Sequence, residues 1–593
     1  MGLFSWSSPT TRSRGDGPFG PCVFTPDSRR LTTLAGMKPL HRALAFRAQA
    51  VACFVLGVLS VHSTGAHAQA QATPPADSAA SAASAKPAEA TPAFAVYEYA
   101  VEGNTVLPVA AVEKAVTPFL GEGKTFADVD GARAALEKTY QDAGYLSVFV
   151  DLPEQAVGDG VIRLVVLEGR IERLAVTGSR YYSQGYIRQQ VPELAEGKVP
   201  NFNVVQAQLA VVNRTEDRRV QPVLRPGHDN GTVEAELQVT DKLPVHGTVE
   251  LNNNHAQYTK PWRLQASARY DNLFQGDHSL SMTAIVAPQD VNESKVLMLD
   301  YSMPEPDGDA WRMSALFSDS SIQALSAATV IGKGFELGLH RQWALPASGN
   351  WLHNLTASVA YKDTKERTLV GSDQLATPIR YVPFGLDYGG SFAHEDGGLS
   401  TLSASMTYGF RQLLRRRQDC ADLGENDQFA CKRNNADGGF AYLRLDGRHT
   451  QPLGRWQVDY RLAVQMSSQP LIGAEQFAIG GPGSVRGYLS AEALGDHGVV
   501  SSLEVRTPNL VTPGWWNIEE LRTYAFVDAG LVRTIYAAQG QAARQGLGSV
   551  GVGLKLRATK ALNLTLDLAD PFKTGTATGI HDPRLHMALS LDF

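Results

Sequence analysis

The last stretch of the chain, about 350 residues, alternates apolar and polar side chains in segment after segment. The final segment shows the pattern most clearly, with Leu585, Met587, Leu589, Leu591 and Phe593 separated by His586, Ala588, Ser590 and Asp592. A period of two puts successive side chains on opposite faces of a β-strand. In an earlier segment the polar face carries Lys555 and Arg557, which a packed apolar core would exclude and a water-filled lumen accommodates.

Segments of about 10 residues with one apolar and one polar face are typical of an outer-membrane β-barrel. We count about 16 of them, beginning near residues 246, 262, 278, 294, 309, 334, 351, 379, 398, 439, 454, 499, 521, 546, 561 and 584. An even number of antiparallel strands can close into a ring that satisfies every backbone group within lipid. We therefore predict an all-β transmembrane barrel of about 16 antiparallel strands over residues 244–593. A secreted array of β-sandwiches does not account for an alternating strand that ends on Phe593.

The overall charge argues against a nucleic-acid-binding protein. The chain carries 54 Lys and Arg residues against 60 Asp and Glu residues, for a net charge of −6. Contacts to a phosphate backbone need clustered basic side chains. Charged residues make up 19% of the chain, below the roughly 25% of an average soluble domain, and a lipid-facing outer surface is compatible with this low share.

One apolar run, Ala48–Val61, lies near the N-terminus. Its 14 residues are fewer than the about 20 that a transmembrane helix needs. Basic residues precede the run and small residues with A-x-A spacing follow it, an arrangement that defines a secretory signal peptide rather than a buried core helix. We assign residues 1–68 to an N-terminal extension and this signal peptide, with Met37 as the expected start. Residues 69–93 are rich in Ala, Pro and Ser and are expected to form a linker.

Two shorter blocks, residues 94–170 and 171–243, precede the barrel and share one pattern. Ala100-Val101-Glu102-Gly103 has a counterpart in Ala175-Val176-Thr177-Gly178, about 75 residues later. In each block helical segments and then a pair of strands follow this motif. We predict two α+β modules with the order β-α-α-β-β.

The main helix of the first block is marked at both ends. Thr125 and Asp128 have the spacing of a capping box, and Gly144 follows the last turn. Its predicted apolar face consists of Val129, Ala132, Leu136 and Tyr140.

The connection over residues 467–498 is unusually long for a turn between strands. If the N-terminal modules are periplasmic, this connection joins strands 11 and 12 on the extracellular side. It contains the run Gly480-Gly481-Pro482-Gly483-Ser484-Val485-Arg486-Gly487-Tyr488. Long loops without structure of their own are usually functional. The candidate motif within it is Val485, Arg486, Gly487 and Tyr488.

An arginine on such a loop is suited to a carboxylate, which it binds through a planar fork. The two strands that follow offer lumen-facing candidates: Glu504 and Arg506 on one, and Phe526, Asp528 and Gly530 on the next. The local sequence permits the loop to fold back into the lumen and Arg486 to pair with Asp528, with Glu504 as the second choice. Gly530 is expected to leave space for the guanidinium. On composition alone, a solvated turn above ordinary lumen charges is an equally good interpretation.

Cys420 and Cys431 are the two cysteines beyond the predicted signal peptide, and 10 residues separate them in a polar segment. An isolated pair in an exported chain is typical of a loop disulfide. The connection between strands 9 and 10 that contains them is also extracellular in our count.

Motifs for catalysis or cofactor binding are not found in the sequence. Gly546-x-Gly548-x-x-Gly551 matches a dinucleotide fingerprint, but it lies on an alternating strand with no helix after it. His581 and His586 flank a turn and a strand, a placement more typical of structural histidines than of a metal site. We expect no enzyme activity, no metal and no cofactor.

Taken together, the chain over residues 94–593 resembles the two-partner-secretion transporters of the haemolysin secretion/activation (ShlB/FhaC/HecB) type. The resemblance rests on the paired modules, which are similar to POTRA domains, and on Leu152-Pro153-Glu154-Gln155, Glu250-Leu251-Asn252-Asn253-Asn254, Tyr270-Asp271-Asn272-Leu273, Val485-Arg486-Gly487-Tyr488 and Phe526-Val527-Asp528-Ala529-Gly530. The resemblance suggests that the loop folds back into the lumen and that Arg486 pairs with Asp528, with Glu504 as the second choice. Members of this family often begin with a helix that plugs the barrel. The Pro-rich composition of residues 69–93 does not favour such a helix here.

The resemblance implies a transporter in the outer membrane of a Gram-negative bacterium, with its N-terminal modules in the periplasm. Its expected partners are outer-membrane lipid and a secreted adhesin-like or haemolysin-like exoprotein, whose N-terminal secretion domain the modules engage. Transport would proceed without nucleotide hydrolysis. A passive porin-like channel and an insertase for other barrels are the alternatives.

Overall fold

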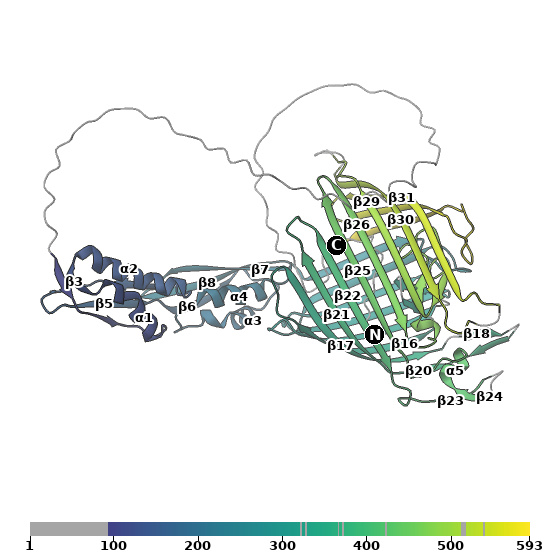
Figure 1. Ribbon diagram of the computed structural model, residues 1–593, viewed down its shortest axis with the longest axis horizontal. Coiled ribbons are helices and arrows are strands. Elements are labelled where there is room, and N and C mark those ends of the chain that lie inside the picture. The colour runs from purple at the N-terminus through teal and green to yellow at the C-terminus, as the bar shows by residue number, and fades with distance from the viewer. Residues whose placement is uncertain are drawn as a thin grey trace, which may run out of the picture.

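The computed structural model describes residues 93–593 except 230, 321–322, 327–328, 332, 366, 371–372, 377, 421–423, 512–516 and 538–539. The predicted signal peptide within residues 1–68, nearly all of the linker 69–93 and the question of a plug helix lie outside the described residues. Two small α+β units extend as an arm from one end of a closed β-barrel (Figure 1). A search of the described helices finds none with the length and apolarity needed to cross a membrane.

The first unit is built on a three-stranded sheet in the order β2-β5-β4. Strand β5 (Val161–Glu168) is central; β2 (Glu98–Glu102) pairs with it in parallel and β4 (Val148–Asp151) antiparallel. Helices α1 (Val109–Val116) and α2 (Phe126–Asp142) complete its core. The remaining elements are β1 (Phe94–Val96), η1 (Thr117–Phe119) and β3 (Gly121–Lys124), of which β1 and β3 form a two-stranded sheet that the sequence did not predict.

Helix α2 follows the sequence prediction closely. The backbone N–H of Thr125 donates to Asp128 Oδ2 at 2.8 Å, as a capping box requires, and Gly144 has a φ of +97° after the last turn. The predicted apolar face of Val129, Ala132, Leu136 and Tyr140 is buried, with no member more than 2% exposed. Burial raises the pKa of the Tyr140 hydroxyl to about 12, and the nearby Glu168 adds to this effect.

The second unit repeats this topology, as the sequence predicts. Its sheet has the order β6 (Arg170–Thr177), β8 (Thr232–Asp241), β7 (Arg218–Pro226), again with one parallel and one antiparallel pair. The helical elements are α3 (Gln184–Gln190), η2 (Pro192–Leu194) and α4 (Phe202–Val212). The two glycines of the repeated motif are equivalent, because a Cβ on Gly103 or Gly178 would lie 2.4 Å from a carbonyl oxygen of the central strand.

The barrel closes through sixteen antiparallel strands, which confirms the predicted fold class. In chain order they are β9 (Val245–Asn252), β10 (Arg263–Leu273), β11 (His278–Val286), β12 (Ser294–Pro304), β13 (Ala310–Ser320), β16 (Gly334–Ala344), β17 (Trp351–Thr364), β20 with β21 (Ile379–Tyr381 and Pro383–Ala393), β22 (Leu399–Gly409), β25 (Ala441–Leu453), β26 (Trp456–Ser467), β29 (His497–Arg506), β30 (Ile518–Arg533), β31 (Arg544–Ala558), β32 (Leu562–Pro571) and β33 (Arg584–Asp592). The eighth strand of the barrel ring is interrupted at Val382, which separates β20 from β21.

The predicted alternation of faces holds along the barrel wall. On β30, Val527 and Leu531 are 42% and 45% exposed on the outer surface, whereas Phe526 and Asp528 are buried inside. The ring is closed by pairing between β33 and β9, the last and first barrel strands. Phe593 extends this seam by two backbone hydrogen bonds with Gly247.

Shorter elements lie in the long connections at the end of the barrel away from the arm. They are β14 (Gln323–Ser326), β15 (Thr329–Ile331), β18 (Arg367–Val370), β19 (Asp373–Ala376), β23 (Arg417–Cys420), β24 (Gly424–Asp427), α5 (Gln428–Lys432), η3 (Gly473–Glu475), β27 (Phe477–Ile479) and β28 (Ala493–Gly495). Elements β18, β23, β24 and α5 are labelled at the far side of the barrel from the arm in Figure 1.

The second unit is attached to the barrel at the turn between β10 and β11. Arg218, whose side chain is fully buried, donates to both carboxylate oxygens of Asp277 on this turn at 2.9 and 2.8 Å. Its guanidinium also lies 4.5 Å from the centre of the Tyr182 ring. Asn272, from one of the sequence motifs, donates to the carbonyl oxygen of Tyr181 at 3.0 Å. The arm is therefore fixed to the barrel by buried polar contacts.

Candidate functional site in the barrel lumen

The loop between β26 and β29, residues 468–496, folds back into the barrel instead of extending into solvent. A short hairpin, β27 with β28, forms its stem. Val485 and Tyr488 are fully buried in an apolar cluster with Ile479, Val500 and other residues of the wall. The interpretation as a solvated turn is therefore wrong for the geometry of this loop.

Arg486 contacts Asp528 through three hydrogen bonds. The guanidinium donates to both carboxylate oxygens, at 2.7 Å from Nε and 3.0 Å from Nη2, and the backbone N–H of Arg486 donates to the same group at 3.1 Å. Asp528 is 0% exposed and Arg486 8% exposed. This is the pair that the sequence analysis expected, and its contribution to function remains a prediction.

Two further carboxylates surround the same guanidinium. Glu504, the expected second choice, accepts from Nη1 at 2.9 Å, and Asp567 lies 3.4 Å from the same nitrogen. Asp567 was missed in the sequence analysis, although its place on the lumen face of β32 among outward leucines was visible. The Tyr524 hydroxyl donates to Asp567 at 2.6 Å and so fixes its position.

The expected role of Gly530 is wrong. A Cβ on this residue would lie 3.0 Å from Val485 Cγ2 and 3.3 Å from Ile479 Cδ1. The space beside Gly530 is thus filled by apolar side chains of the loop. The guanidinium lies instead over the ring of Phe526, 3.4 Å from its centre, where the face of an aromatic ring attracts a cation.

Gly487 and Tyr488 fix the tip of the loop. Gly487 has a φ of +89°, a conformation that favours glycine, and its N–H donates to His586 Nε2 at 2.9 Å. The Tyr488 hydroxyl lies 2.7 Å from the carbonyl oxygen of Lys573 and accepts from the N–H of Gly548 at 3.1 Å. His586 therefore has the structural role that its sequence position indicated.

The glycines that mimic a dinucleotide fingerprint make room for aromatic rings. A Cβ on Gly551 would lie 2.3 Å from the Phe526 ring, and one on Gly548 would lie 2.5 Å from the Phe572 ring. Glycine in a strand often marks such a close approach. The pattern is explained by packing and not by nucleotide binding.

The descending half of the loop has its own attachment. The Glu492 carboxylate accepts from the backbone N–H groups of Leu489, Ala577 and Thr578 and from the Thr578 hydroxyl, at 2.7 to 3.0 Å. Ser490 contacts Asn254, which follows the first barrel strand. The loop is thus connected to both sides of the seam between β33 and β9.

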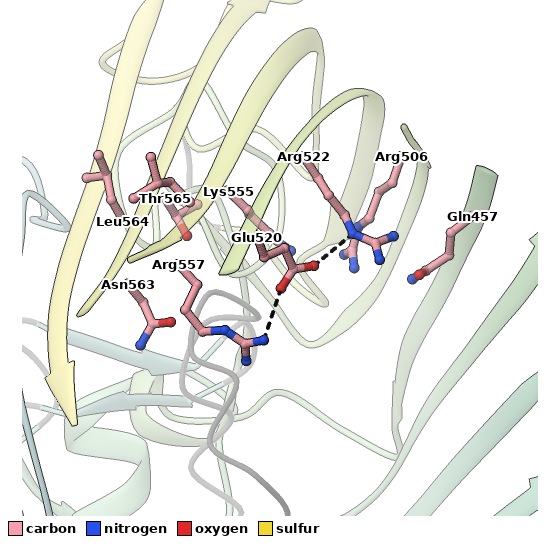
Figure 2. Close-up of a pocket in the computed structure, with 10 residues that line it drawn as sticks. Gln457, Arg506, Glu520, Arg522, Lys555, Arg557, Asn563, Leu564 and Thr565 are labelled. Carbon is pink, nitrogen blue, oxygen red and sulfur yellow. Dashed lines mark ion pairs between the residues drawn. The ribbon is translucent and has the colours of Figure 1, made fainter. Parts of the chain in front are cut away.

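Charged residues continue from Arg486 toward the end of the lumen where the arm is attached. Arg506 pairs with Glu504 and lies 3.1 Å from Asp459, so it supports a partner of Arg486 from the barrel wall. Next to it, a cavity of about 90 Å³ is lined by Arg506, Arg522, Lys555 and Arg557 together with Glu520. Figure 2 shows Glu520 between two of these arginines, with Arg522 Nε at 2.7 Å.

Cys420 and Cys431 form a disulfide in the connection between β22 and β25. Close to it, Arg433 donates to both carboxylate oxygens of Asp496 at the base of the candidate loop, one of them at 2.8 Å. Asp496 also accepts from the N–H groups of Leu471 and Ile535. Burial raises the pKa of the Asp496 carboxyl, but these hydrogen bonds lower it by a larger amount. Its pKa therefore lies below the ordinary value.

Two groups of residues in the described part of the chain bring three potential metal ligands within 4.8 Å: Asp217, His246 and Asp271, and Glu305, Asp307 and Asp309. Basic side chains already form ion pairs with members of both groups. Lys242 lies 3.2 Å from Asp217, Arg269 lies 2.8 Å from Asp271, and Arg341 lies 2.7 Å from both Glu305 and Asp309. We therefore assign no metal to either.

A sixteen-stranded barrel with an inward-folded loop, preceded by paired units of this topology, defines the class of outer-membrane barrel proteins that carry POTRA domains. The family model of the haemolysin secretion/activation protein ShlB/FhaC/HecB matches residues 231–556, and a POTRA domain of the ShlB type matches residues 94–169. The chain belongs to the haemolysin secretion/activation (ShlB/FhaC/HecB) family. This confirms the resemblance drawn from the sequence motifs.

Curated relatives agree with this assignment, and solved structures share the fold. The outer membrane transporter CdiB of Escherichia coli is 25% identical over 181 residues, which is 30% of this chain and 30% of that protein. CdiB of Dickeya dadantii (strain 3937) is 23% identical over 487 residues, 79% of this chain and 81% of that protein. The fold is similar to that of CdiB from Escherichia coli, with a TM-score of 0.58 at 18% identity over 86% of this chain and 93% of that one. BamA from Haemophilus ducreyi lacking POTRA domains 1–3 has a TM-score of 0.50 at 16% identity, covering 84% and 100% of the two chains.

Proposed function

We propose that this protein is an outer-membrane transporter of two-partner secretion, which carries one large adhesin-like or haemolysin-like exoprotein from the periplasm to the cell surface. The observation that carries the proposal is a ShlB-type barrel with two POTRA-type units fixed to its periplasmic end. Family membership and relatives described as outer membrane transporters support it. A passive porin would not need the two units.

In this proposal residues 94–170 and 171–243 are the modules that capture the N-terminal secretion domain of the exoprotein. Each three-stranded sheet ends in strands with no further partner among the described residues: β2 and β4 in the first unit, β6 and β7 in the second. Extended peptides can add to such edges through main-chain hydrogen bonds. Phe149 on β4 is 60% exposed beside Leu167, which is 46% exposed, and this pair offers apolar contact next to the edge.

The barrel would then provide the path, and Arg486 would hold the loop in the position that secretion requires. Because the sequence has no P-loop, we infer that outward movement is driven by folding of the exoprotein at the cell surface and not by nucleotide hydrolysis. The charged residues that line the lumen in Figure 2 would keep this path hydrated.

Deletion of the gene tests the proposal. One specific secreted protein should accumulate in the periplasm or be degraded there, whereas the amounts of other outer-membrane proteins stay normal. A general loss of outer-membrane barrels would indicate an insertase. An unchanged secretome together with reduced uptake of small solutes would indicate a porin.

A further inference from the structure

The first half of the candidate loop is fixed to a different part of the wall by Glu475, in η3. Its side chain is fully buried. One carboxylate oxygen accepts from Lys362 Nζ at 3.0 Å and from the Tyr381 hydroxyl at 2.6 Å, and the other accepts from the Tyr442 hydroxyl at 2.7 Å. Three strands therefore bind one carboxylate of the loop.

The surroundings of Glu475 keep it in place and charged. Its backbone carbonyl oxygen accepts from Arg444 at 3.1 Å and from Gln465 at 3.3 Å. Glu336 lies 3.3 Å from the Lys362 ammonium and shares it with Glu475. Burial raises the pKa of Glu475, but the Lys362 ammonium and the tyrosine hydroxyls lower it by a larger amount. Its pKa therefore lies below the ordinary value.

Glu475 and Arg486 attach the loop to two neighbouring arcs of the ring. The seventh, eighth and tenth barrel strands bind Glu475, whereas the twelfth, thirteenth and fifteenth bind Arg486. Arg486 follows Glu475 by eleven positions in the chain, a separation that can span about 40 Å. The two attachments together hold the loop against about half of the inner wall.

We propose that Glu475 is a positioning residue that, together with Arg486, holds the loop inside the lumen as a closure of the resting barrel. Release of Glu475 frees one side of the loop and opens the path, while the Arg486 attachment keeps the other side on β30. The inference rests on the proposed transport function, because a barrel that passes a polypeptide needs a closure when none is in transit.

The test measures ionic current through purified full-length protein in planar lipid bilayers, without any exoprotein. The variants are Glu475→Ala and Glu475→Gln, which remove the charge. Asp300→Asn is the matched control, since Asp300 is a lumen-facing carboxylate whose ion pair is with Arg312 on the neighbouring strand, at 3.7 Å. A shift in gel mobility on heating verifies that each barrel is folded.

Time-averaged current should rise at least about tenfold for Glu475→Ala, the effect expected from loss of charge-assisted hydrogen bonds that favour the closed state. Glu475→Gln should give a smaller rise, and Asp300→Asn should match the wild type. Wild-type current for Glu475→Ala, or an equal rise for Asp300→Asn, would overturn the proposal.

If Glu475→Ala does not reach the membrane, the double variant Tyr381→Phe/Tyr442→Phe replaces it. It removes the two hydroxyl donors and leaves Glu475 paired with Lys362. Its current should therefore be higher than that of the wild type and lower than that expected for Glu475→Ala. Unchanged current in this folded variant would also overturn the proposal. The current measurement needs no partner protein and is therefore independent of the secretion assay. An unchanged current would overturn the closure and leave the transport proposal intact. A failure of secretion would overturn the transport proposal and leave the current measurement valid.

Discussion

The guanidinium of Arg486 is surrounded by three carboxylates, which come from β29, β30 and β32. Three acids at one buried point repel one another unless a cation lies between them. Arginine is suited to this position because its planar fork offers five N–H donors, whereas lysine presents a single ammonium. The residue thus connects the loop to three strands through one group.

Arg486→Ala and Arg486→Lys should both impair secretion while the barrel still folds and inserts. Removing one partner of a buried ion pair typically costs about 3–5 kcal/mol, since the other charge stays buried without compensation. We expect Asp528→Ala to resemble Arg486→Ala, and the double variant to be little worse than either single one. Secreted exoprotein and barrel heat-modifiability are the measurements.

The control for this series is Arg312→Lys and Arg312→Ala, at a lumen arginine that pairs with Asp300 and not with the loop. Both control variants should secrete normally. Additive defects of Arg486→Ala and Asp528→Ala, or full secretion by Arg486→Ala, would show that the pair has no shared function.

Part of this site could be predicted from the sequence and part could not. The Arg486–Asp528 pair is suggested by the family resemblance and permitted by the local sequence, because strand alternation places Asp528 inside and the glycine-rich loop must turn sharply. Asp567 and the filled space beside Gly530 depend on how deep the loop lies in the closed barrel. That depth depends on the register between strands that are distant in the sequence, and the apolar pattern of a single strand does not reveal this register.

Glu475 should make the closed state insensitive to moderate acid. Its depressed pKa means that the attachment is fully present above the ordinary glutamate pKa, about 4.3, and is lost only as the pH falls through the lower value of the closed state. Lys362, Arg444, Tyr381 and Tyr442 are the groups that face Glu475, and Glu336 is the other acid that faces the same ammonium. Bilayer currents should be constant from about pH 8 to about pH 5 and rise only below about pH 4. A rise between pH 7 and 5 that Glu475→Gln abolishes would contradict this.

At the scale of elements, the connection that contains the disulfide also makes contacts with the candidate loop. Phe429 on α5 and Phe440 pack with Leu471 and Ile472 at the start of the candidate loop. Arg433 adds its bonds to Asp496 and donates to the carbonyl oxygen of Ile535 at 2.9 Å. The connection therefore lies against the loop through packing and charge, whereas the disulfide closes the connection on itself.

Replacing both Cys420 and Cys431 by Ser should leave secretion largely intact and make this connection more sensitive to protease. Closing a loop of about 10 residues contributes about 2–3 kcal/mol by chain entropy, and less where other contacts already restrain the ends. Protease digestion of intact cells and secretion assays measure the two effects. A double variant that cannot secrete, with normal barrel levels, would mean that the disulfide has more than a structural role.

Elements were predicted more fully than their contacts. The capping box and the apolar face of α2 are local features, as are the alternating barrel strands, and both were visible in the sequence. The sheet of β1 with β3 was not, because β3 (GEGK) carries no apolar alternation and owes its pairing to tertiary context.

At the scale of the whole molecule, the two units and the barrel form one connected body. Val199 of the second unit packs into the core of the first, and Arg218 joins the second unit to the barrel turn through Asp277. A substrate bound on the arm would therefore be presented to the lumen in a fixed orientation.

Deleting residues 94–170 with the signal peptide retained should abolish secretion and leave a heat-modifiable barrel in the outer membrane. The barrel closes through its own strands, so it does not need the first unit to fold. Cell fractionation and secretion assays measure the outcome. Continued export by this variant would show that strand addition at the first unit is the wrong mechanism.

The most direct measurement of the central claim is translocation by purified protein in liposomes. The probe is the N-terminal secretion domain of the exoprotein whose export the gene deletion abolishes, added unfolded to the side that carries the arm. The account predicts that this domain becomes protected from protease inside the vesicles without any nucleotide, and that Arg486→Ala abolishes protection while Arg312→Ala does not. Absence of protection with folded, correctly oriented wild-type protein, or protection that requires ATP, would contradict it.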